Sequence, residues 1–248
     1  MKAHIAYPDA KAFRTIIEAL AKIVDEVAMH VSQEEFRIKA IDPAHIALIE
    51  IHLPSTSFIE YELETDAGEV VGGISIANMF KVIKRAKKGE KLDIDITDDN
   101  IVLTITSSAI KKYTFKNIEV SEPEIPEAVM EFNVRALLIA DTLKNALKDA
   151  EAVGDTLEIE APSDEELILR GKGVGFTETK IRAGSPALLE LEVKEASKSA
   201  YSVEYLKHVV ALTKIADTIQ LEYSSQMPIR LQFNLPGEGK VIYLLAPK

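Results

Sequence analysis

The residues best suited to chemistry in this sequence are lysines and arginines that recur at helical spacing. Lys81, Lys84 and Lys88 stand at positions i, i+3 and i+7 of a segment without any acidic residue, so a helix would place them on one face. Like charges at this spacing destabilise a helix by roughly a few tenths of a kcal/mol for each pair, and a polyanion would offset that cost. The pattern therefore predicts contact with phosphate groups, without any reading of base sequence.

Three further segments carry similar cationic pairs. The predicted phosphate-contacting residues are Lys11, Arg14, Lys81, Lys84, Arg85, Lys88, Lys144, Lys148, Lys207 and Lys214. The four segments hold 13 of the 29 lysines and arginines but only 5 of the 40 acidic residues, although the net charge of the chain is −11. Merely solvated helix faces are the alternative interpretation. Because binding depends on where positive charge lies, an acidic chain can still bind a nucleic acid.

Catalytic and metal-binding patterns are missing from the sequence. There is no cysteine, no phosphate-binding loop and no Gly-x-Ser-x-Gly motif, and the five histidines lack metal-ligand spacing. Asp93 and Asp95 alternate with apolar residues, so we expect them to face solvent on a strand rather than to bind a metal. His45 is expected to be a hydrogen-bonded structural histidine. The prediction is a protein that is not an enzyme and needs no cofactor, with a metal-dependent or small-molecule enzyme as the alternative.

Two kinds of periodicity position these residues. Period-two alternation predicts strands at 69–74, 92–96, 101–105, 157–161, 167–169, 189–193, 219–223, 229–233 and 240–245. Helical spacing predicts helices at 9–24, 75–88, 135–150 and 202–214, with Asp9, Ser75 and Ser202 as N-caps. The same order of elements occurs in both halves, and an offset of 126 residues aligns Lys81 with Lys207. An internal duplication within an α+β fold is predicted.

A connector separates the halves. Residues 117–127 hold two prolines and four glutamates, which favour an extended segment. We therefore expect domains at 1–116 and 128–248, joined by this connector. No apolar run approaches a membrane span, and the N-terminus lacks a signal-peptide core, so a soluble cytoplasmic protein without a membrane partner is expected, associated with the nucleoid if the source is prokaryotic.

Five short motifs, in order along the duplicated chain, resemble a known family. They are Ile41–Ile49, Glu122–Pro126, Gly154-Asp155, Gln226–Ile229 and Tyr243–Lys248. Over essentially its whole length the chain is similar to the archaeal–eukaryotic DNA sliding clamp, the proliferating cell nuclear antigen family. The resemblance implies a DNA polymerase processivity factor with two duplicated domains of the clamp type. Helices would form the inner face of a ring around duplex DNA, with antiparallel sheets outside.

The resemblance also implies particular site residues. Arg14, Lys81, Lys84 and Lys148 fall where family members present basic residues to the channel. Partner proteins, namely DNA polymerase, flap endonuclease and ligase, would insert a short motif called the PIP box into a pocket under the connector. By position this pocket comprises Ile41, His45, Ile46, Leu48, Ile125, Pro126, Pro228, Leu244, Leu245, Ala246 and Pro247. A separate clamp loader would open the ring.

Subunit contacts in the family join edge strands of the two halves. Here these would be 109–116 and 175–182, with Tyr113, Phe115, Phe176 and Ile181 on the buried side. The resemblance implies a closed ring of three subunits, either a homotrimer or a heterotrimer. A specialised subunit of a heterotrimer with paralogues is the alternative that the sequence leaves open.

Overall fold

The computed structural model describes residues 1–122 and 130–248. The chain divides into two compact units. The first unit contains three segments: Met1–Pro43, Leu235–Val241 and the described residues of Ile49–Glu124. The second unit also contains three: Ala44–Leu48, Ile242–Lys248 and the described residues of Ile125–Asn234. Two short segments, 44–48 and 235–241, thus belong to the unit formed mainly by the other half of the sequence. The consecutive boundaries at 116 and 128 stay a prediction.

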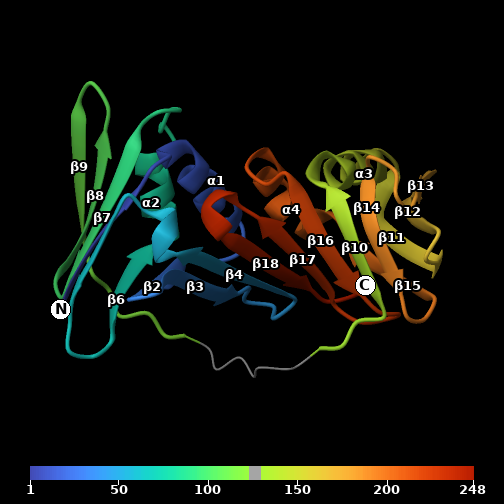
Figure 1. Ribbon diagram of the computed structural model, residues 1–248, viewed down its shortest axis with the longest axis horizontal. Helices are drawn as coiled ribbons and strands as arrows, with labels where there is room; N and C mark the ends of the chain where they lie inside the picture. Colours follow the sequence, from blue (N-terminus) through green and yellow to red (C-terminus); the bar gives the residue numbers. More distant parts are fainter. Residues whose placement is uncertain (123–129) are drawn as a thin grey trace. The chain divides into compact units, whose positions relative to one another are not determined.

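The first unit contains nine strands and two α-helices (Figure 1). The strands are β1 (Lys2–Tyr7), β2 (Glu26–Ser32), β3 (Glu35–Ile41), β4 (Ala47–Pro54), β5 (Glu60–Glu64), β6 (Glu69–Ser75), β7 (Lys91–Thr97), β8 (Asn100–Thr106) and β9 (Ile110–Lys116). The helices are α1 (Ala10–Leu20) and α2 (Ile76–Ile83). One sheet has the order β5-β1-β7-β8-β9, and the other strands follow the order β4-β3-β2-β6.

The second unit repeats this arrangement. Its strands are β10 (Val134–Ile139), β11 (Gly154–Ser163), β12 (Glu166–Gly173), β13 (Phe176–Arg182), β14 (Leu188–Val193), β15 (Ser197–Ser202), β16 (Thr218–Tyr223), β17 (Ile229–Asn234) and β18 (Lys240–Leu245). The helices are α3 (Ala140–Val153) and α4 (Val203–Val209), and a 3-10 turn, η2, covers Val210–Lys214. The orders β14-β10-β16-β17-β18 and β13-β12-β11-β15 match those of the first unit strand for strand, which confirms the predicted duplication.

Each unit buries apolar faces of its helices against its strands. Phe13 of α1 and Met79 of α2 are fully buried in the first unit, where the two helices lie side by side (Figure 1). In the second unit α3 packs on β11 and β12 and also contacts α4. Asp9 caps α1 as predicted, because its carboxylate accepts hydrogen bonds from the backbone N–H groups of Lys11 and Ala12. Ser75 and Ser202 occupy the N-cap positions of α2 and α4, but their side chains make no capping bond.

The predicted helices have different bounds in the structure. The segment 135–139 is not helical: it belongs to β10, which pairs with both β14 and β16. Val134, Ala136 and Leu138 are fully buried there, and this alternation was hidden because the apolar run also fits a helix. The helix predicted at 75–88 ends at Ile83, and that predicted at 202–214 changes to a 3-10 turn after Val209.

A close approach between a helix and a strand fixes α3 on its sheet. A Cβ atom at Gly171 of β12 would lie 2.5 Å from the Cα of Ala150 in α3. Only glycine fits at this distance, so the strand lets the helix backbone come close. The position of α3, and of the lysines on it, depends on this contact.

We therefore expect Gly171→Ala to lower the free energy of unfolding by about 1–3 kcal/mol, because the added methyl group must push α3 away from β12. Urea denaturation followed by circular dichroism measures the change. Gly175→Ala is the control, since its Cβ would meet only the side chain of Val153 at 3.2 Å, and its loss should be smaller. Equal stability of Gly171→Ala and the wild-type chain would contradict the packing argument.

Candidate nucleic-acid and partner-binding sites

The first unit gathers predicted phosphate-contacting residues around the end of α2. The guanidinium group of Arg14 in α1 donates hydrogen bonds to the carbonyl oxygens of Lys84 and Ala86, at 3.2 Å each. These carbonyls follow the last turn of α2 and have no helical donors, so Arg14 caps the helix. Arg14 therefore has a structural role and also brings its positive charge next to Lys84. Sequence spacing alone did not indicate this cap.

The exposed cations of this segment are unpaired. Lys81, Lys84, Arg85 and Lys88 are all exposed and form no ion pair with any residue that the structure describes. The prediction that Lys81, Lys84 and Lys88 share one helical face is wrong for Lys88. The helix stops at Ile83, and Lys88 lies in a turn next to Gly89, whose φ of 85° is incompatible with a helix. Lys11, on α1, is also exposed.

In the second unit, some of the predicted phosphate-contacting lysines form ion pairs within the protein. Lys144 forms an ion pair with Asp141 one turn earlier in α3, at 2.8 Å, and lowers the pKa of that carboxyl group. Lys207 of α4 is paired with Glu151 of α3. Lys148 and Lys214 are exposed and form no ion pair within residues 1–122 and 130–248. The predicted set therefore contains paired and unpaired members.

Several cations on the strands are ion-paired, in contrast to those of α2. Lys39 contacts Glu50 at 3.1 Å, and hydrogen bonds from His52 and Lys39 lower the pKa of Glu50 to about 2. In the second unit the Glu158 carboxylate faces Lys198 at 3.1 Å and Arg170 at 3.3 Å. These partners satisfy the charge locally, so the strand cations are less available to an external anion.

Part of the predicted partner pocket is assembled within the second unit. The backbone N–H of Ala246 donates to the carbonyl of Ile46 at 2.9 Å, so the C-terminal tail lies beside the segment 44–48. Ile46 is exposed by 38%, and Leu244, Ala246 and Pro247 are half-buried, so these four offer apolar surface. Pro228 is also half-buried.

The other predicted pocket residues differ in their solvent exposure. Leu48 and Leu245 are buried in the core, so they support the surface rather than form it. His45 is exposed with φ of 57°, and none of the hydrogen bonds within the described residues involves its side chain, so its expected role as a hydrogen-bonded structural histidine stays a prediction. Ile41 is half-buried in the first unit. Ile125 and Pro126 lie outside the described residues.

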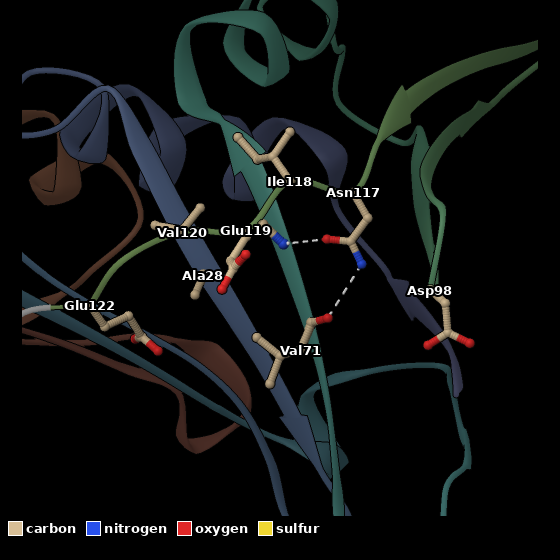
Figure 2. Close-up of a pocket in the computed structure, with 9 residues that line it drawn as sticks. Ala28, Val71, Asp98, Asn117, Ile118, Glu119, Val120 and Glu122 are labelled. Atoms are coloured by element: carbon tan, nitrogen blue, oxygen red, sulfur yellow. Dashed lines mark hydrogen bonds between the residues drawn. The ribbon is translucent and has the colours of Figure 1, made fainter.

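The beginning of the connector forms a cavity that the sequence did not reveal. The cavity has a volume of about 360 Å³ and lies between the connector and the first unit's β2 and β6. Figure 2 shows the connector crossing β6, with hydrogen bonds between the Asn117 side chain and the strand backbone. The lining residues are Ala28, Val71, Gly73, Asp98, Asn117, Ile118, Glu119, Val120 and Glu122. The only signal in the sequence was an amide side chain directly before the alternating pair Ile118 and Val120.

The two predicted subunit edges are terminal strands in this chain. β9 ends the order β5-β1-β7-β8-β9, and β13 ends the order β13-β12-β11-β15. Phe176 on β13 is 59% exposed and Ile110 on β9 is 74% exposed, while Tyr113 and Phe115 are half-exposed. Ile181 is already buried within its own unit, at 6% exposure, so it adds little apolar surface to an interface.

The expected solvent exposure of the acidic strand residues is wrong for Asp93. This carboxylate is 7% exposed and contacts Lys91 at 2.8 Å, while Asp95 contacts His4 at 2.8 Å. Among the described residues, no group of His, Cys, Asp and Glu could hold a metal ion. Within the same residues, no helix is long and apolar enough to span a bilayer.

Comparison with known proteins covers nearly the whole chain. Residues 4–125 match the family model of the proliferating cell nuclear antigen N-terminal domain, and residues 143–248 match that of the C-terminal domain. The chain is 36% identical over 242 residues to "DNA polymerase sliding clamp 1" of Aeropyrum pernix, covering 96% of this chain and 97% of the relative. The corresponding protein of Sulfurisphaera tokodaii is 38% identical over 246 residues, covering 99% of both chains.

Solved structures agree with the sequence comparison. The crystal structure of PCNA from Thermococcus kodakaraensis matches with a TM-score of 0.91 and 27% identity, over 99% of this chain and 100% of that chain. A chain of the PCNA2–PCNA3 complex from Sulfolobus tokodaii gives the same TM-score and identity, over 99% of both chains. The predicted clamp-type fold with two duplicated α+β domains is thereby confirmed. The chain belongs to the proliferating cell nuclear antigen family.

Proposed function

We propose that this protein is a sliding clamp subunit, a DNA polymerase processivity factor that encircles duplex DNA and tethers replication and repair enzymes. The observation that carries the proposal is the whole-length match to relatives named DNA polymerase sliding clamps, together with unpaired cations at α2. The chain supplies no catalytic step, and an ATP-driven clamp loader opens the ring.

Weak phosphate contacts explain how such a protein moves along DNA. Lys81, Lys84 and Arg85 are exposed and lack ion pairs within the described residues, so they can neutralise phosphates without first breaking a local contact. Lysine ammonium groups do not distinguish bases when they contact the backbone, so binding has no sequence preference. The ring, rather than affinity, prevents escape from the DNA.

We expect Lys81→Ala combined with Lys84→Ala to reduce polymerase stimulation on a long primed template by about fivefold at moderate salt, because two phosphate contacts are lost from each subunit. Primer extension after loading measures this effect. Lys2→Ala with Lys194→Ala is the matched control, since both lysines are exposed, removal changes the charge equally, and neither lies on a helix. An unchanged extension length for the helix variant would count against phosphate contact at α2.

The partner pocket is proposed to hold the aromatic and aliphatic side chains of a PIP-box motif. Ile46, Leu244, Ala246 and Pro247 present apolar surface, and the backbone bond between Ala246 and Ile46 keeps the tail beside the segment 44–48. Buried aromatic anchors supply most of the energy in such contacts. A partner strand can also add to the exposed backbone near the C-terminus.

Ile46→Ser should weaken binding of a fluorescent PIP-box peptide by about tenfold, because an exposed aliphatic contact is replaced by a hydroxyl group. Fluorescence anisotropy gives the dissociation constant. Ile59→Ser is the control, because Ile59 is another exposed isoleucine, at 60%, that lies outside the predicted pocket. Equal losses in both variants would remove Ile46 from the binding surface.

Duplication gives a physical reason for ring assembly. By their place in the sheets, β9 corresponds to β18, and β13 corresponds to β4. β9 and β13 are terminal in their strand orders, so each has one edge that is not paired within the described residues. An open edge favours pairing with another chain, and head-to-tail pairing closes into a ring.

Phe176→Asp should dissociate the assembled ring, since it removes an exposed aromatic contact worth roughly 2 kcal/mol, about a thirtyfold change in the association constant, and adds a charge. Sedimentation velocity at several concentrations measures the distribution of species. Leu189→Asp on the terminal strand β14 is the control, at 42% exposure, and should leave the assembly intact. Persistence of the ring in Phe176→Asp would exclude β13 from the interface.

A heterotrimer subunit is the second candidate. It is favoured by the similar PCNA2–PCNA3 complex and by relatives whose names carry the number 1. The same edge strands would then pair with paralogues. Sedimentation of the purified wild-type chain separates the candidates, because a homotrimer forms alone and a heterotrimer subunit remains a monomer or dimer.

A further inference from the structure

The connector is held on the first unit at its start by the side chain of Asn117. The Oδ1 atom accepts a hydrogen bond from the backbone N–H of Gly73 at 2.8 Å, and the Nδ2 atom donates to the carbonyl of Thr97 at 2.9 Å. The backbone N–H of Asn117 donates to the backbone carbonyl of Asp99, also at 2.9 Å. One side chain therefore links the connector to β6, as Figure 2 shows, and also to the end of β7.

The next residue lies directly on β6. The backbone N–H of Ile118 donates to the carbonyl of Gly73 at 3.0 Å. A Cβ atom at position 73 would lie 1.8 Å from the carbonyl oxygen of Ile118 and 2.8 Å from a methyl group of Val120. The absence of a side chain at Gly73 is therefore required for this docking.

A second anchor lies at the far end of the described part of the connector. The imidazole of His30 in β2 has one carboxylate at each nitrogen: Glu122 at 2.8 Å from Nε2 and Glu69 at 3.2 Å from Nδ1. The His30 side chain is only 13% exposed, so its position is fixed by packing. Glu122 is thus tied to β2 at a defined point.

We propose that Asn117 and the His30–Glu122 pair are positioning residues for partner binding: they fix the course of the connector and thereby increase the affinity for PIP-box peptides. The inference rests on the proposed function. Ile125 follows Glu122 by three residues in the sequence, and three residues of extended chain span at most about 11 Å. The anchor at Glu122 is the described contact that lies nearest in sequence to this predicted partner residue.

The energetic effect follows from chain entropy. A connector that is free at residues 117–122 must become ordered when a peptide binds, and each ordered residue costs roughly 1–2 kcal/mol of backbone entropy. Anchors that hold the segment before binding remove part of this cost. Loss of an anchor should therefore weaken binding even though no anchor residue needs to touch the peptide.

The test compares isosteric and truncating variants of the full chain. Glu122→Ala and Asn117→Ala should each raise the dissociation constant of a fluorescent PIP-box peptide by about five- to tenfold. Glu122→Gln retains an oxygen that can accept from His30 and should bind within about twofold of wild type. Glu119→Ala is the matched control, because Glu119 is an exposed acid on the same segment that makes no hydrogen bond or ion pair to the described residues.

Amide hydrogen exchange provides the second measurement. Exchange of the Ile118 N–H should become faster in Asn117→Ala together with the loss of affinity, while sedimentation should show the wild-type assembly. Unchanged affinity despite faster exchange would overturn the inference, as would an equal loss in Glu119→Ala or no recovery in Glu122→Gln. A wild-type chain that binds no PIP-box peptide would instead contradict the proposed function itself.

Discussion

The pattern of paired and open strand edges is the constraint on which the rest of this structure depends. Each unit builds the same two strand orders from its half of the sequence, so each has the same edges to satisfy. β9 and β13 end their strand orders in the described part of the chain, so each leaves one edge without a partner strand. An open edge of this kind favours association with another chain.

Not every terminal strand is suited to association. β5 carries Glu60, Glu62 and Glu64, and its counterpart β14 carries Glu190 and Glu192. Rows of carboxylates on a terminal strand repel a second copy, so these edges stay solvated. β9 and β13 instead expose Ile110 and Phe176. The distribution of acidic and apolar residues therefore favours β9 and β13 over β5 and β14 for the proposed association.

The cations also divide into two groups: some are ion-paired on strands, and others are exposed near α2 without an ion pair among the described residues. Arg170 and Lys198 lie on strands and share the carboxylate of Glu158, so their charge is used within the fold. Lys81 and Lys84 have no such partner among the described residues, although carboxylates are more numerous than cations in the chain. Ion pairs at exposed sites contribute little to stability, so leaving these lysines unpaired costs the fold almost nothing. The charge stays available for an external anion.

Much of the fold could be predicted from the sequence because the same order of helical and strand patterns occurs in both halves. The alternation in 101–105 and 219–223 has the period of a half-buried strand, and both segments are strands. Errors arose where a local pattern fits two structures: the apolar run at 135–139 has the composition of a helix, and only its pairing with β14 and β16 makes it a strand. Lys88 was misplaced on the helix because α2 ends at Ile83 and Gly89, with φ of 85°, interrupts the helical backbone. The cap from Arg14 could not be foreseen, because that residue is distant in sequence.

The proposed partner site could be described from the sequence only by its chemical type. Apolar residues near the C-terminus and around position 46 are visible as composition, but burial separates Leu245 from Leu244, its neighbour in the sequence, and no periodicity reveals that one of them is fully enclosed. The docking of the connector on Gly73 was equally hidden, because the glycine and the asparagine are separated by 44 residues. A hydrogen bond of 2.8 Å between these two residues needs both the missing side chain of one and the amide of the other. The docking of the connector therefore depends on Gly73 and Asn117 together, and their importance can be recognised only once the fold has placed them side by side.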